Sequence, residues 1–106
     1  MPYIWLTKRT IDLIKPLGKV DNVVREAVMT MIEEGADDVV DYPGPAPTSS
    51  ARVSGDTWYL VNRMKTEFEY RTVDELVFDA VVNLYVKKGM PAECVEKLVK
   101  VVDSKY

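Results

Sequence analysis

The apolar residues of this chain recur at helical spacing in two stretches that match each other. In the second stretch, residues 72–88, they fall at i, i+3, i+4 and i+7 over four turns, which predicts an amphipathic helix. Thr72 followed by Glu75 is typical of a capping box at a helix start, and the Lys-Lys-Gly sequence at 87–89 is typical of a helix end. The apolar face consists of Val73, Leu76, Val77, Ala80, Val81, Leu84 and Tyr85.

The first stretch has the same spacing 53 residues earlier. The sequence VDNVVREAV, which begins at Val20, aligns with VDELVFDAV, which begins at Val73. This match predicts a long helix over residues 20–34 and indicates a tandem duplication. A half of about fifty residues would be only marginally stable alone, so we expect both halves of the 106-residue chain to share one core in a single domain.

One short strand is predicted at the start of each half. In residues 3–7, Ile4 and Leu6 fall on one face and their neighbours on the other, which is the alternation of a half-buried strand. Residues 57–61 have a similar apolar and aromatic composition and predict the second strand. Residues 63–71 fit either two turns of helix or a strand paired with the second one, so both interpretations stay open.

A short helix is predicted after the first strand. It should begin at a hydroxyl cap, for which Thr7 and Thr10 are the candidates. It should end at Ile14, because the residue before Pro16 is pushed out of the helical region.

The rest of the chain is predicted to be a connector and a last helix. Residues 36–56 are rich in proline, glycine and serine, which is typical of a solvated linker. Residues 90–106 predict a C-terminal helix that docks on the second half through Val95, Leu98 and Val102.

The net charge of −3 is unevenly distributed. Residues 35–56 contain four aspartates and only Arg52, which accounts for the whole excess of negative charge. The amino-terminal end is locally basic, because residues 1–19 contain four cations and only Asp12 as an anion. These cations are Lys8, Arg9, Lys15 and Lys19.

Several classes of function are disfavoured by composition. The chain has no histidine and one cysteine, Cys94, so it lacks the usual residues for a zinc site, an internal disulfide or a cysteine or serine nucleophile paired with histidine. Asp74 with Asp79, or Asp21 with Glu26, could form a pair of catalytic carboxylates, but each is expected on the polar side of an exposed helix turn. We therefore expect no enzymatic activity, no metal and no cofactor. Without a long apolar run or a secretory leader, a cytoplasmic protein without membrane association is expected.

The duplicated unit YIWLTKRTIDLIKPLGKVDNVVREAVMTMIEEG resembles the ribbon-helix-helix family of DNA-binding regulators. The segments IWLTKRTIDLI and TVDELVFDAVVNLY carry the match, which covers residues 3–35 well and 57–89 less well. The resemblance implies a mainly α fold with a short two-stranded antiparallel ribbon, in a tandem pseudo-dimer followed by a C-terminal helix. It also implies that residues 3–7 pair with about residues 58–62 within the single domain 1–106.

The function implied by this resemblance is that of a transcriptional regulator that places its ribbon in the major groove of double-stranded DNA. A positive face would favour DNA, whereas a Trp and Tyr patch without cations would favour the alternative, a protein-binding module such as an antitoxin-like or assembly factor. Whether the chain forms a homo-oligomer is left open. The DNA-binding residues carried over are Tyr3, Trp5, Thr7, Lys8, Arg9, Tyr59, Val61, Asn62, Arg63 and Lys65.

Overall fold

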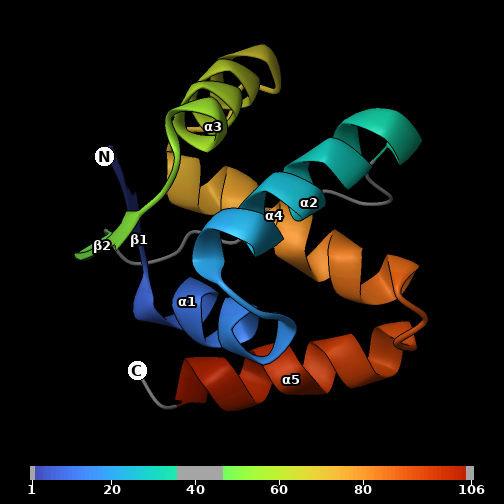
Figure 1. The fold of residues 1–106 in the computed structure, drawn as a ribbon. Helices are drawn as coiled ribbons and strands as arrows, with labels where there is room; N and C mark the ends of the chain where they lie inside the picture. Colours follow the sequence, from blue (N-terminus) through green and yellow to red (C-terminus); the bar gives the residue numbers. More distant parts are fainter. Residues whose placement is uncertain (1, 36–46, 105–106) are drawn as a thin grey trace.

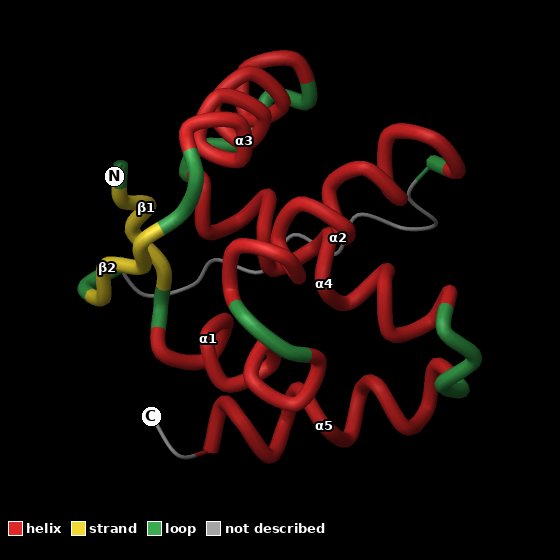
Figure 2. Tube along the Cα trace, viewed as in Figure 1, coloured by secondary structure: helices red, strands yellow, loops and turns green. Residues whose placement is uncertain are grey.

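The computed structural model of the protein describes residues 2–35 and 47–104. In these residues the chain is mainly helical, with five α-helices and one two-stranded antiparallel sheet (Figure 1, Figure 2). None of the described helices is both long enough and apolar enough to cross a membrane. The elements are β1 (Tyr3–Leu6), α1 (Lys8–Ile14), the 3₁₀ helix η1 (Lys15–Leu17), α2 (Val20–Glu34), β2 (Ser49–Arg52), α3 (Gly55–Glu67), α4 (Val73–Lys87) and α5 (Ala92–Ser104).

The two long helices, α2 and α4, cross at the centre of the molecule (Figure 1) and form its most extensive contact between elements. Ala27 of α2 and Ala80 of α4 are both fully buried, and such small side chains allow helices to approach closely. The sequence predictions for these two helices are confirmed, because α2 begins at Val20 and α4 begins at Val73. α4 is buried on several sides, and its buried apolar residues are Leu76, Val77, Phe78, Ala80, Val81, Leu84 and Tyr85.

Hydroxyl caps fix the beginnings of three helices. Thr7 Oγ1 accepts a hydrogen bond from the amide of Thr10 at the start of α1, which identifies Thr7 as the cap of that helix. Thr72 Oγ1 accepts from the amide of Glu75 at the start of α4, as its capping sequence predicts. Ser54 caps α3 in the same way. A side-chain cap of this kind satisfies an amide that the first helical turn leaves without an intrahelical partner.

The sheet is a two-stranded ribbon, but its second strand is not the predicted one. β1 pairs antiparallel with β2, so that Tyr3 lies opposite Arg52 and Leu6 opposite Ser49. The prediction of a strand at residues 57–61 is wrong, because these residues belong to α3. The physical reason is burial: Thr57, Val61 and Met64 are the buried residues of α3, and their i, i+4 and i+7 spacing puts them on one face of a helix.

Two further segments differ from their predictions. Of the two interpretations of residues 63–71, the helical one holds as far as Glu67, where α3 ends. The predicted linker 36–56 is wrong at its C-terminal end, because β2 and the first turn of α3 lie there. Residues 36–46 of that linker lie outside the described part of the chain.

The C-terminal helix α5 packs against α1 and α4 (Figure 1). Its buried residues are Val95, Val99 and Val102, so Val95 and Val102 dock as predicted, but they dock on α1 of the first half as well as on α4. Leu98 is only partly buried against the core, and Val99 is buried next to it. The helix therefore lies on one side of the α2–α4 pair, next to the first short helix.

Candidate functional site

The outer face of the ribbon exposes two large aromatic side chains at the predicted site. Along β1 the pleat turns Ile4 and Leu6 into the core and leaves Tyr3 50% and Trp5 57% exposed. On β2, Ala51 faces inward. The four outward positions are Tyr3, Trp5, Ser50 and Arg52.

Tyr3 and Arg52 are opposite each other in the ribbon and contact each other across it. Arg52 Nη2 donates a hydrogen bond of 3.3 Å to Tyr3 Oη. The guanidinium also lies over the Tyr3 ring, with 5.6 Å between its carbon and the ring centroid. One cation is therefore held on the outer face of the ribbon beside an aromatic side chain.

A buried carboxylate ties the end of β1 to the second long helix. Asp74 Oδ1 accepts hydrogen bonds from the amide of Thr7 at 2.7 Å and from Thr7 Oγ1 at 3.0 Å. Asp74 is only 2% exposed, so the expectation that it faces solvent is wrong. Its carboxylate is buried because these two donors at the β1–α1 junction satisfy it.

The equivalent carboxylate of the first long helix makes the equivalent contact with the β2–α3 junction. Asp21 Oδ1 accepts from the amide of Ser54 at 3.0 Å and from Ser54 Oγ at 3.2 Å. Hydrogen bonding to Thr57, followed by that to the Ser54 amide, lowers the pKa of Asp21 below its ordinary value. Each long helix thus uses the second residue of its first turn to hold the strand–helix junction of the other half.

The ribbon register repeats the same correspondence. Ile4 lies opposite Ala51, and both are buried. An offset of 47 residues relates Ile4 to Ala51 and the cap Thr7 to the cap Ser54, whereas an offset of 53 relates Val20 to Val73. The difference of six residues lies between the strand and the long helix, because α3 has 13 residues where α1 has 7.

A shallow groove of about 310 Å³ runs between β1, α3 and the start of α4. The aromatic residues that line this groove are Tyr3, Trp5 and Trp58. Lys65 and Arg71 also line it, and no carboxylate does. Arg71 is paired with Glu75 at 3.2 Å, on the first turn of α4. The complete lining is Tyr3, Ile4, Trp5, Pro47, Trp58, Asn62, Lys65, Arg71, Thr72 and Val73.

Of the five predicted site residues in the first half, three lie on the surface. Tyr3 and Trp5 face outward from the ribbon, and Lys8 is exposed at the start of α1. Thr7 is buried and engaged as a helix cap. Arg9 is only 7% exposed, and its guanidinium lies 4.3 Å from the centroid of the Phe78 ring. Thr7 and Arg9 are therefore not exposed as the DNA-binding role predicted for them requires.

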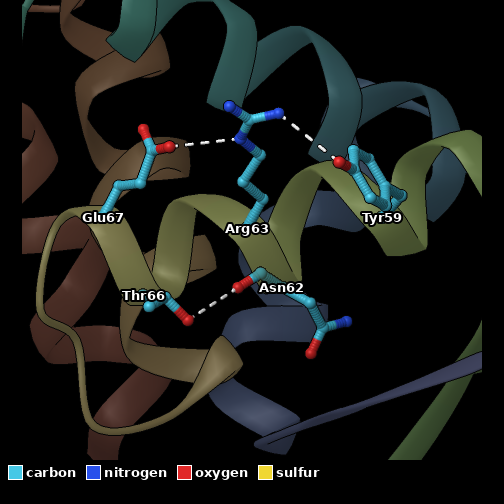
Figure 3. Close-up of polar contacts among 5 residues, drawn as sticks. All are labelled: Tyr59, Asn62, Arg63, Thr66 and Glu67. Carbon is cyan, nitrogen blue, oxygen red and sulfur yellow. Dashed lines mark hydrogen bonds and ion pairs between the residues drawn. The ribbon is translucent and has the colours of Figure 1, made fainter.

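The five predicted residues of the second half lie on α3 and not on a strand. Val61 is 0% exposed and belongs to the core. Arg63 is held on the surface of α3 between Glu67 Oε1, 3.1 Å from Nε, and Tyr59 Oη, 3.4 Å from Nη1 (Figure 3). Asn62 donates a hydrogen bond to a backbone carbonyl of its own helix. Lys65, which lines the groove, is the cation of this group that lies beside the ribbon.

The residues that sequence reasoning missed are Ser50, Arg52 and Arg71. Ser50 and Arg52 fell inside the predicted linker, and their strand has few residues of high β-propensity. A usable signal was present: Ser54 followed by Thr57 repeats the spacing of Thr7 followed by Thr10 at the start of the first short helix.

Comparison of this chain with protein-family models, with curated proteins and with solved structures gives no match. Within residues 2–35 and 47–104, no group of three or more His, Cys, Asp or Glu side chains is placed to hold a metal ion. The features that bear on function are therefore the ribbon, the groove beside it and the helices that hold them.

Proposed function

We propose that the protein binds double-stranded DNA through the outer face of its β1–β2 ribbon and acts as a transcriptional regulator. In this proposal the chain is a tandem ribbon-helix-helix pseudo-dimer, in which β1, α1 and α2 form one half and β2, α3 and α4 form the other. The C-terminal helix α5 is an addition to the second half.

The observation that carries the proposal is the pair of reciprocal carboxylate contacts. Asp74 holds the amide and hydroxyl of Thr7, and Asp21 holds the amide and hydroxyl of Ser54. Two contacts of the same kind, each from one half to the other, are what an interface with two-fold symmetry contains. Ile4 and Ala51 lie opposite each other at the centre of the ribbon and are also related by the offset of 47 residues, which supports the same symmetry.

The dimensions of the ribbon support contact with a duplex. A major groove about 12 Å wide admits a two-stranded ribbon, whose outward side chains then reach the base edges. Here those side chains are Tyr3, Trp5, Ser50 and Arg52.

The charge beside the ribbon supports contact with phosphates. Lys8 is exposed at the end of β1, Arg52 lies on the ribbon, and Lys65 and Arg71 line the adjacent groove. These four cations lie on or beside the ribbon in a chain whose net charge is −3, and Arg71 is at the same time paired with Glu75. Such contacts would set the position of the protein on DNA, while the ribbon would read the sequence.

The experiment that tests this proposal is an NMR titration of the full-length, isotopically labelled chain with a mixed-sequence duplex at low salt. We expect the amide signals of Tyr3–Leu6 and Ser49–Arg52 to shift, and those on the exposed side of α5 to stay unchanged. Shifts restricted to α5 would contradict the proposal. The absence of any shift at low salt would also contradict it, because non-specific electrostatic binding is strongest at low salt.

A second candidate function is binding of a protein partner at the same face. The exposed aromatic residues Tyr3, Trp5, Trp58 and Tyr59 favour it, because aromatic side chains are enriched in protein interfaces and give few hydrogen bonds to base edges. The two functions separate on salt, since only DNA binding requires the steep decrease in affinity that comes from counterion release.

A further inference from the structure

We infer that the DNA site is non-palindromic and is bound in one orientation, because the two halves of the ribbon present different side chains to it. This inference rests on the proposed DNA binding and specifies the class of duplex that the ribbon reads. A symmetric homodimer presents the same residues twice, and its sites therefore reflect its two-fold symmetry.

The register of the ribbon identifies which outward residues correspond. Because Ile4 lies opposite Ala51, a two-fold axis through this pair would exchange Tyr3 with Ser50 and Trp5 with Arg52. In each exchange a large aromatic side chain corresponds to a different kind of residue: Tyr3 corresponds to the small Ser50, and Trp5 to the charged Arg52. The backbone of the ribbon is thus symmetric around its centre, while its outer face is not.

The two half-faces match different bases. An arginine fork such as that of Arg52 fits the O6 and N7 acceptors of guanine in the major groove. Trp5 and Tyr3 present apolar ring surface, which suits the methyl group of thymine better than a hydrogen-bonding edge. We therefore expect a guanine at one end of the contacted bases and thymine at the other, without the mirrored copy of either.

The protein surfaces on the two sides of the ribbon also differ from each other. α3 and α1 lie on opposite sides of the ribbon (Figure 1), and the aromatic groove lies on the α3 side. With the offset of 47, Trp58 and Lys65 of that groove correspond to Ile11 and Gly18 on the α1 side. Within the described residues, a duplex placed on the ribbon would therefore meet aromatic side chains along the α3 flank and none on α1, which adds a second reason for a single orientation.

The test is selection of binding sites from a pool of random duplexes, with the full chain and with a variant whose half-faces are alike. The Tyr3→Ser, Trp5→Arg variant has serine and arginine at the outward positions of both strands. We expect the parent to enrich a non-palindromic site and the variant to enrich a palindrome. The variant should bind the parent's site about tenfold more weakly. Phe68→Ser, which removes an exposed aromatic residue at the end of α3, is the control and should keep the parent's site.

The outcomes separate this inference from the function on which it rests. A palindrome selected by the parent would overturn the inference and leave DNA binding in place, as would a variant that selects the parent's site unchanged. No enrichment by the parent would overturn DNA binding itself. If the double variant does not fold, Arg52→Ala serves instead: it should lose about tenfold in discrimination at one base position, whereas loss at two symmetric positions would contradict a single orientation.

Discussion

Removal of the Asp74 carboxylate is expected to destabilise the protein more than any other single change at the ribbon. In Asp74→Ala, the amide and the hydroxyl of Thr7 lose their acceptor at a position that is almost inaccessible to water. A hydrogen bond to a charged group contributes about 1.5 to 3 kcal/mol, and a buried donor left unpaired adds a desolvation cost of similar size. We expect a loss of about 3 kcal/mol, a large part of the 5–15 kcal/mol typical of a small domain.

The matched control is Asp21→Ala, which removes the equivalent carboxylate from the first long helix. The same two donor types are affected, on Ser54, but this site is only partly buried, so water can replace the lost acceptor. The expected cost is about 1 kcal/mol. Asp21→Ala also removes the hydrogen bond with Thr57, so a larger loss in Asp74→Ala despite this extra contact would report the effect of burial.

The assay is equilibrium unfolding in urea, with the midpoint and the slope fitted separately so that a change in stability is distinguished from a change in the unfolded state. A double-mutant cycle with Thr7→Ala should give a coupling energy of about 1 to 2 kcal/mol. If Asp74→Ala cost no more than Asp21→Ala, or if the cycle showed no coupling, the carboxylate would not be what holds the two halves together at this junction.

Three further results are expected. Hydrogen bonding to Thr57 lowers the pKa of Asp21, so its contribution to stability is complete above the ordinary pKa of 3.8 and is lost as the pH falls below it; urea unfolding of Asp21→Asn should depend less on pH in this acidic range than that of the parent. Burial raises the pKa of Tyr70, so the contribution of this shift to stability is complete below pH 10 and is lost as the pH rises further. The stability of Tyr70→Phe should therefore fall less steeply with rising alkaline pH than that of the parent, and an equally steep fall would contradict this. Truncation after Gly89 removes α5 and uncovers apolar surface on α1 and α4, so it should lower the melting temperature or cause association in sedimentation; a monomer as stable as the parent would show that α5 is not needed for the core.

The long helices could be predicted from the sequence because their signals are local. The cap Thr72 and the apolar positions from Val73 onward specify α4 without reference to any other part of the chain. The same is true of α2, and of β1, whose alternation is short but regular. The two long helices match each other at an offset of 53 residues, and this match can be seen in the sequence alone.

The second strand could not be predicted, because its signal is not local. Ser49, Ser50, Ala51 and Arg52 have low β-propensity, and they form a strand because β1 offers a pairing partner and a buried position for Ala51. Carrying the offset of 53 from the long helices back to the strands put the second strand within α3. The six extra residues of the second half, which lengthen α3, cause that error.

The candidate site was predicted in part for the same reason. Tyr3, Trp5 and Lys8 follow from the first strand and are exposed where they were expected. Arg9 was assigned to the surface because a cation next to a strand end is usually solvated, but the Phe78 ring offers it a buried position. A contact between residues 69 positions apart has no signal in the sequence around either one.

Binding of duplex DNA by the ribbon and its neighbouring cations can be tested by measuring how the affinity depends on salt concentration. Two double variants each lower the net charge from −3 to −5: Lys8→Ala, Arg52→Ala beside the ribbon, and Lys97→Ala, Lys100→Ala on the exposed side of α5. With one phosphate for each of the four cations beside the ribbon, the parent should show a log–log slope of about −3.6, and the ribbon variant about −1.8. The α5 variant should keep the parent's slope. The absence of binding by the parent at low salt would contradict DNA binding. The same slope change in both variants would contradict binding through the ribbon and its neighbouring cations.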